Sequence, residues 1–88
     1  DLSVQALADR AAMSARHFAR AFADEVGQTP GKFVRQARLE AARRMLEETG
    51  HHIDQVAWRC GYKSIETMRR AFVRGLGVSP GDYRHRFQ

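Results

Sequence analysis

The sequence contains an internal repeat, in which the second half of the chain resembles the first at an offset of 50 residues. Seven of the 20 positions that begin at Ser14 are identical to the positions 50 residues later, which indicates a duplication. The identical pairs are Ser14 and Ser64, Arg20 and Arg70, Ala21 and Ala71, Phe22 and Phe72, Gly27 and Gly77, Pro30 and Pro80, and Gly31 and Gly81. Because 88 residues are too few for two independent cores, both units are predicted to belong to one small domain.

The repeat extends toward the N-terminus with a shift of one residue. Before residue 14 the offset falls to 49, which pairs Ala8 with Ala57 and Ala12 with Gly61. Each unit then reads as a short helix, a turn and a longer helix, which is the arrangement of a helix-turn-helix. The second unit is therefore expected to have one more residue in its turn.

Residues that favour helix ends stand between the helical stripes. Ser14 and Ser64 suit N-caps, Gly27 suits a left-handed C-terminal residue, and Thr29-Pro30 suits the start of a long helix. The predicted helices cover residues 4–11, 15–26, 30–48, 53–60 and 65–76, and Ser79-Pro80 opens a last short one. We therefore predict an all-α domain over 1–88, in which two helix-turn-helix subdomains of the homeodomain-like kind, 1–28 and 50–88, are joined by a long linker helix within 29–49.

Helical spacing also predicts which side chains are inside. Phe18, Ala21 and Phe22 are expected to be buried in the first unit, and Cys60 in the core of the second. Trp58 lies off the apolar stripe of its helix, and we expect it to pack against the linker helix. Apolar residues cover more than half the circumference of the linker helix, so it should pack on a neighbour at each end.

The balance of charge makes a polyanion a plausible partner. Fifteen Lys and Arg residues against ten Asp and Glu give a net charge of +5 and a pI near 10.3. Thirteen of the fifteen are Arg, which suits bidentate recognition of phosphate and guanine but also follows from a GC-rich genome. Composition alone does not choose between recognition and genome bias.

Several classes of protein are disfavoured. The single cysteine cannot form an internal disulfide, and the four scattered histidines do not complete a zinc site with it, so no cofactor or metal is expected. No stretch reaches 18 uninterrupted apolar residues and no signal peptide is evident, which favours a soluble, cytoplasmic protein. No nucleophile, base and orienting group come together, so enzymatic activity is not expected.

The outward faces of the two longer helices carry the candidate nucleic-acid contacts. The amino-terminal half of such a helix meets base edges in a DNA groove, and Arg can chelate guanine while Glu can accept from cytosine. The predicted base contacts are Arg16, Arg20, Glu66, Arg69 and Arg70. The predicted backbone or accessory contacts are Ser14, His17, Lys63, Ser64 and Thr67.

Roles that do not involve DNA could also account for some of these residues. Arg16 and Arg69 could be solvated surface charges, and Glu66 could simply complement the helix dipole. The repeat could also form a helical protein-interaction module, because helix-turn-helix units occur in proteins that do not bind DNA. Salt-dependent and sequence-selective binding to duplex DNA distinguishes the two functions.

The chain resembles the AraC/XylS family over essentially its whole length. The resemblance is carried by Leu2 to Ala8, Met13 to Phe22, Gly27 to Pro30, Ile53 to Tyr62 and Gly77 to Arg84, with Arg38, Ala41, Arg43 and Leu46 in the linker. It implies the DNA-binding domain of a bacterial transcription regulator, whose two recognition helices enter successive major grooves about 34 Å apart. It also implies double-stranded DNA as the partner, and RNA polymerase as a possible second one.

Two departures from the family pattern carry further expectations. Family domains usually have another helix before the segment that begins at Leu2, so the core of the first unit is expected to be incomplete. The run from Ser64 to Phe72 is similar to the subgroup with a PfpI-like, amidotransferase-like sensor domain ahead of the DNA reader. That sensor domain, if present in the full protein, lies outside this chain.

Overall fold

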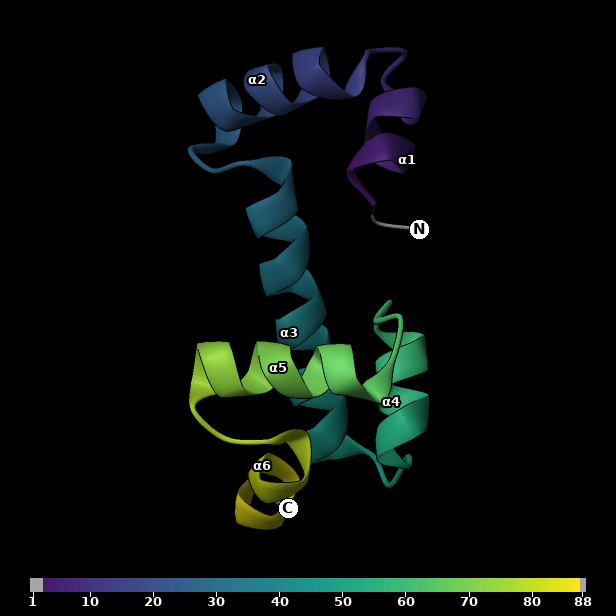
Figure 1. Ribbon diagram of the computed structural model, residues 1–88, viewed down its shortest axis with the longest axis vertical. Helices are drawn as coiled ribbons and strands as arrows, with labels where there is room; N and C mark the ends of the chain where they lie inside the picture. The colour runs from purple at the N-terminus through teal and green to yellow at the C-terminus, as the bar shows by residue number, and fades with distance from the viewer. Residues whose placement is uncertain (1–2, 88) are drawn as a thin grey trace. The chain divides into compact units, whose positions relative to one another are not determined.

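The computed structural model describes residues 3–87, and these form six α-helices and no strand (Figure 1). The helices are α1 (Val4–Arg10), α2 (Ala15–Val26), α3 (Pro30–Glu48), α4 (Ile53–Arg59), α5 (Ile65–Leu76) and α6 (Pro80–Phe87). The prediction of an all-α fold is confirmed. None of these helices is long and apolar enough to cross a membrane. Leu2, part of the family resemblance, lies outside the described residues.

The chain forms two compact units, and the boundary between them lies inside α3. The first extends to Ala37 and contains α1, α2 and the start of α3, whereas the second begins at Arg38 and contains the rest of α3 with α4, α5 and α6. The residues assigned to the linker from the sequence, 29–49, are thus shared between the two units. Within each unit a short helix packs against a longer one, α1 on α2 and α4 on α5.

The predicted duplication is visible in the helix ends. Helices α1 and α4 each have 7 residues, and α2 and α5 each have 12. The side chains of Ser14 and Ser64 each accept a hydrogen bond of 3.1 Å, from the backbone N–H groups of His17 and Thr67. Both longer helices end at a glycine in the left-handed conformation, with φ of 86° and 77°.

The turns between the paired helices also correspond. Met13 N–H donates to the Ala8 carbonyl at 3.0 Å, and Tyr62 N–H donates to the Ala57 carbonyl at 2.9 Å. The residue at the bend is Ala12 in the first unit, with φ of +57°, and Gly61 in the second, with φ of +87°. Because a side chain disfavours this backbone region, the second turn has the better suited residue.

The second unit has a continuous core. Phe72, Leu46, Met68 and Val56 are fully buried. Figure 1 shows α4, α5 and α6 grouped around the C-terminal half of α3, which supplies Leu46 to this core. Cys60 is 8% exposed, as expected for a core residue.

The position of Trp58 contradicts the prediction that this residue packs against the linker helix. Its side chain is 82% exposed and does not pack against α3. The buried stripe of α4 consists of Val56 and Ala57, followed by Cys60, and a seven-residue helix has room for only one such face. Trp58 therefore points away from the core.

The first unit is less completely covered. Its aromatic residues pack on one another, with ring centroids 5.6 Å apart for Phe18 and Phe22 and 5.4 Å apart for Phe22 and Phe33. No residue of α2 is buried, so Phe18, Ala21 and Phe22 are half-buried rather than buried as predicted. Ala8, Pro30 and Val34 are the described residues of this unit that are buried.

An arginine closes the C-terminal end of α3. The guanidinium of Arg84 donates to the carbonyl oxygens of Leu46 at 3.3 Å, Thr49 at 3.2 Å, and His51. The last carbonyls of a helix have no partner within the helix, and a cation also suits the negative end of the helix dipole. Arg84 thus joins α6 to the end of α3.

Candidate nucleic-acid interface

The first half of α2 exposes two arginines on one face. Arg16 and Arg20 are four residues apart, so they lie one helical turn apart on the same side, and both are exposed. Among the described residues neither forms an ion pair with Asp or Glu. His17 is also exposed, and Ser14 caps the helix directly before them. The structure thus brings together the four site residues predicted in the first unit.

The start of α5 combines a capped N-terminus with exposed polar residues. The Ser64 hydroxyl accepts from Thr67 N–H and lies 3.0 Å from the Thr67 hydroxyl oxygen. Lys63, in the turn before the helix, is exposed. Positive charge beside the free N–H groups of a helix start favours an anion such as phosphate.

Glu66 forms ion pairs with both arginines that follow it on α5. Its Oε1 lies 2.6 Å from Arg69 Nη2 and 3.3 Å from Arg70 Nε, and its Oε2 lies 2.9 Å from Arg69 Nε. The residues are three and four positions apart, the spacing at which helical side chains meet. The side chain of Arg69 is 49% exposed, that of Arg70 66% and that of Glu66 50%, so the cluster lies on the surface.

These contacts alter the protonation of the cluster. The hydrogen bond from Arg69 lowers the pKa of the Glu66 carboxyl to about 2, with further lowering by the charges of Arg69 and Arg70. The same hydrogen bond raises the pKa of the Arg69 guanidinium. Glu66 is therefore an anion throughout the physiological pH range.

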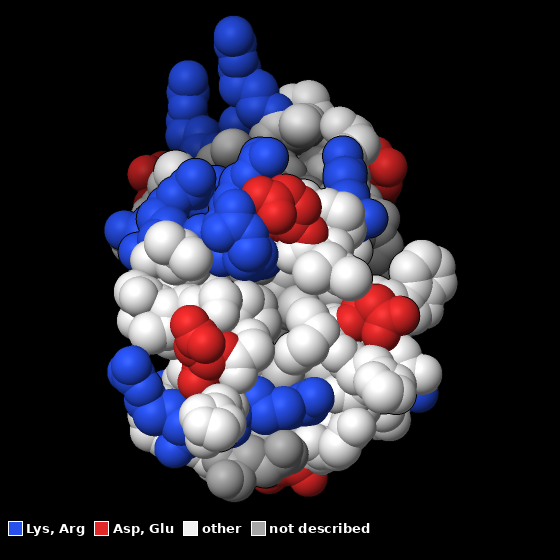
Figure 2. Space-filling view, turned by 60° about the horizontal axis from the view of Figure 1, so that its bottom comes forward, with Lys and Arg blue, Asp and Glu red and all other residues white. Residues whose placement is uncertain are grey.

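Other arginines have partners away from these two helix starts. In α3, Glu40 Oε1 lies 2.8 Å from Arg43 Nη2 and 3.9 Å from Arg44 Nη2. Figure 2 shows Lys and Arg side chains in clusters with Asp and Glu side chains between them. The basic residues thus do not form an unbroken positive surface on this face.

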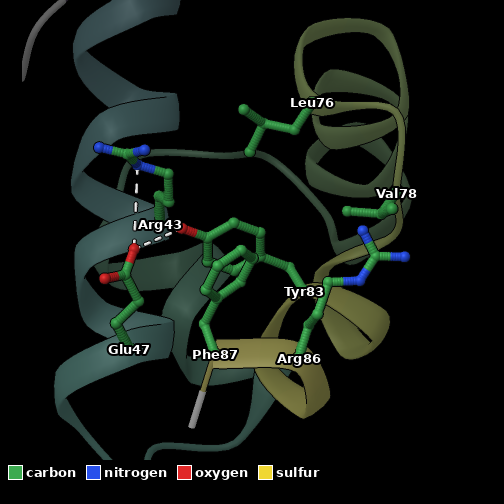
Figure 3. Close-up of a pocket in the computed structure, with 7 residues that line it drawn as sticks. All are labelled: Arg43, Glu47, Leu76, Val78, Tyr83, Arg86 and Phe87. Carbon is green, nitrogen blue, oxygen red and sulfur yellow. Dashed lines mark hydrogen bonds and ion pairs between the residues drawn. The ribbon is translucent and has the colours of Figure 1, made fainter.

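A cleft of about 400 Å³ lies in the second unit, beside the C-terminal end of α5 (Figure 3). Its lining residues are Arg43 and Glu47 of α3, Leu76 and Val78, and Tyr83, Arg86 and Phe87 of α6. The Tyr83 hydroxyl donates to the Glu47 carboxylate, and the rings of Tyr83 and Phe87 are 4.6 Å apart. The hydrogen bond to Glu47 joins α6 to α3, whereas the ring contact lies within α6. Within residues 3–87 no three His, Cys, Asp or Glu side chains are grouped as a metal site would need.

Two features of the structure were missed in the sequence. The pairing of Glu66 with both arginines could have been read from its i, i+3 and i+4 spacing. The role of Arg84 could not, because its carbonyl partners lie 33 to 38 positions earlier in the chain.

Comparison with known proteins agrees with the helix-turn-helix geometry. The family described as "Helix-turn-helix domain" matches residues 7–86. An HTH-type transcriptional regulator of Mycobacterium tuberculosis is 57% identical over 81 residues, and a putative AraC-like transcription regulator of Streptomyces lividans is 40% identical over 82. The alignments cover 92% and 93% of this chain but 31% and 27% of those proteins, so the chain spans less than a third of their length.

Among solved structures, the chain is similar to the DNA-binding domain of AdpA, which was solved in complex with a target DNA. AdpA is described as a global transcriptional factor. The TM-score is 0.91 at 39% identity, and the match covers 99% of this chain and 78% of that one. The similarity extends over both helix-turn-helix units. The chain belongs to the AraC-type helix-turn-helix family of DNA-binding domains.

Proposed function

We propose that the chain binds duplex DNA in a sequence-specific manner, as the DNA-binding part of a bacterial transcription regulator. In this proposal α2 and α5 enter successive major grooves. The observation that carries it is the repetition of one device: a serine-capped helix of 12 residues with charged side chains exposed on its first turns. The similarity to a domain described in complex with DNA supports the same conclusion. Because the two helices differ in sequence, one chain is expected to read an asymmetric site.

We assign the base contacts to exposed residues in the first half of each helix. In α2 these are Arg16 and Arg20, and in α5 they are Glu66, Arg69 and Arg70. Arg pairs with guanine O6 and N7, whereas Glu accepts from the amino group of cytosine. Their one-turn spacing lets each set face neighbouring base pairs.

We assign contacts with the sugar-phosphate backbone to the turns and helix starts. Lys63 precedes α5 and provides a positive charge, while Ser64 and Thr67 stand at its capped N-terminus. Ser14 and His17 occupy the corresponding positions of α2. Helix N-termini and lysine bind phosphate without regard to base sequence, so these residues would position the reader rather than select the site.

The rest of the full protein is a further part of the proposal. The relatives are between about three and four times as long as the matched segment, and they are named as regulators rather than enzymes. We expect a sensor domain of the amidotransferase-like kind ahead of this one, a cytoplasmic location, and contact with RNA polymerase.

A second candidate function, protein interaction, is favoured by one observation. Trp58 is 82% exposed, and tryptophan is enriched among residues that dominate protein interfaces. This function is compatible with DNA binding, since α4 is not one of the two proposed readers. Trp58→Ala should leave DNA affinity unchanged if the side chain serves a protein partner only.

Selection of binding sites from a library of random duplexes tests the proposed function. The purified chain should enrich one asymmetric motif, and its affinity for the enriched duplex should fall steeply as salt rises. Sequences that remain random after repeated rounds, or a flat response to salt, would contradict sequence-specific DNA binding.

A further inference from the structure

We propose that Glu66 suppresses binding of the second reader to DNA of arbitrary sequence, by pairing with Arg69 and Arg70. Helix α5 would then bind DNA well only where a base donates a hydrogen bond to Glu66. This inference rests on the proposed function and adds a role for one carboxylate within it.

The geometry leaves Glu66 able to hold both arginines and still accept one more bond. A carboxylate offers about four acceptor positions, two on each oxygen. Oε1 accepts from Arg69 and Arg70, and Oε2 accepts from Arg69 only. One position on Oε2 is thus available to the amino group of cytosine or adenine. Glu66 thus holds Arg69 and Arg70 and can also accept a hydrogen bond from a base.

The first unit of the repeat has a helix equivalent to α5, the helix α2, that lacks a carboxylate at the position of Glu66. At an offset of 50 residues, Glu66 corresponds to Arg16, and Arg70 corresponds to Arg20. Neither Arg16 nor Arg20 forms an ion pair with Asp or Glu among the described residues, so a carboxylate holds neither of these two charges. On α5 the carboxylate leaves one net positive charge among three side chains. The duplicated helices therefore carry opposite charges at this equivalent position, Arg16 in α2 and Glu66 in α5, as they also do at Asp24 and Arg74.

This difference has a direct consequence for DNA of the wrong sequence. Binding to phosphate releases counterions, and each neutralised phosphate contributes about 0.9 to the salt slope. Arg69 and Arg70 must leave Glu66 and bind phosphate before they can contribute to DNA affinity. The Glu66 carboxylate itself is repelled by the phosphates of the DNA backbone. A cytosine or adenine whose amino group donates to Oε2 compensates for this repulsion, whereas a guanine or thymine at the same place offers only acceptors and does not.

The test compares Glu66→Gln with the parent chain on two probes, a duplex enriched by selection and a fluorescent duplex of shuffled sequence. Glutamine keeps the shape and removes the charge. On the shuffled duplex we expect roughly fivefold to tenfold tighter binding in 0.1 M salt, and a salt slope about 0.9 steeper, as for one additional phosphate contact. The ratio of the affinity for the selected duplex to that for the shuffled duplex should fall by at least about fivefold.

Glu40→Gln is the matched control. Glu40 has the same spacing to Arg43 and Arg44 as Glu66 has to its arginines, and the same exposure of 50%. It lies on α3, outside the two readers. We expect less than about a twofold change on either duplex, because Glu40 is not among the proposed DNA contacts and salt weakens the effect of an exposed charge that does not touch the DNA. An equal gain from Glu40→Gln and Glu66→Gln would overturn the inference.

A second background shows whether Glu66 acts through the arginines. In a chain that carries Arg69→Gln and Arg70→Gln, the gain from Glu66→Gln on shuffled DNA should largely disappear. A gain that persists in full would overturn the proposed pairing role while leaving DNA reading intact. If the parent chain itself fails to distinguish the two duplexes, the proposed function fails and the inference fails with it.

Discussion

The side chain of Arg38 lies against the backbone of Gly61, at the turn of the second helix-turn-helix. A Cβ atom placed on Gly61 would be 3.1 Å from Arg38 Nε, and the backbone there has a φ of +87°. The connecting helix α3 and the turn before α5 therefore meet at a position that favours glycine for two independent reasons, conformation and space.

Gly61→Ala should destabilise the chain more than Gly77→Ala. Both residues have positive φ, which costs an alanine about 1 kcal/mol or more, but a Cβ on Gly77 has no atom within 4 Å. Gly61→Ala adds the close approach to Arg38 and is expected to cost about 2 kcal/mol in total. Urea unfolding of the two variants measures the difference. Equal losses would show that the contact with Arg38 has no energetic weight.

Arg84 should contribute mainly to stability. Arg84→Met keeps much of the length of the side chain but removes the bonds to three carbonyl oxygens, one in the last turn of α3 and two just after it, and should cost about 2 to 3 kcal/mol of unfolding free energy. The control is Arg86→Met, at an exposed position of the same helix, which should cost less than about 0.5 kcal/mol. Thermal unfolding followed by circular dichroism compares them. Similar losses from both variants would contradict the assignment of Arg84 as the cap.

The carboxyl group of Glu66 should titrate well below its ordinary value near 4.5. With its pKa at about 2, the ion cluster is complete above pH 5 and its contribution is lost as the pH falls through about 2. Carboxyl carbon chemical shifts, followed by NMR as the pH is lowered, measure this value directly. In Arg69→Gln the pKa should rise toward its ordinary value, because the strongest hydrogen bond is removed. A normal pKa in the parent chain would mean that the cluster does not persist in solution.

The elements that the sequence predicted well depend on local signals. Helices α2 and α5 each begin after a serine and end at a glycine. Ser14 and Ser64 can therefore be assigned as caps without knowledge of packing. The repeat then transfers each assignment from one unit to the other. The turn of the first unit is the exception, because Ala12 adopts a conformation that suits glycine.

The features that were wrong or missed depend on which side of a helix faces the core. Trp58 is predicted from the sequence to pack against α3, although the stripe formed by Val56, Ala57 and Cys60 already fills the inner face of α4. In the sequence Arg84 is one of thirteen arginines, yet its charge is used within the fold. Net charge therefore overstates how much of the positive charge is available to DNA.

Base recognition and phosphate binding should separate in two single variants. Arg16→Ala should relax the preference at one or two base pairs and cost roughly 1 to 3 kcal/mol on the selected duplex, with little loss on shuffled DNA. Lys63→Ala should weaken binding to both duplexes alike and lower the salt slope by about one. Fluorescence anisotropy at several salt concentrations gives both quantities. Equal weakening by Arg16→Ala on the two duplexes would reassign Arg16 to the backbone and direct the search for base contacts to His17 and Arg20.

Simultaneous reading of DNA by both helices should be visible in a hydroxyl-radical footprint on the selected duplex. We expect a single chain to protect about 15 to 20 base pairs, in two blocks about one helical turn apart on one side of the duplex. Titration should show one chain per site. Protection of one block only, or of no defined block, would contradict the proposal that α2 and α5 bind successive major grooves.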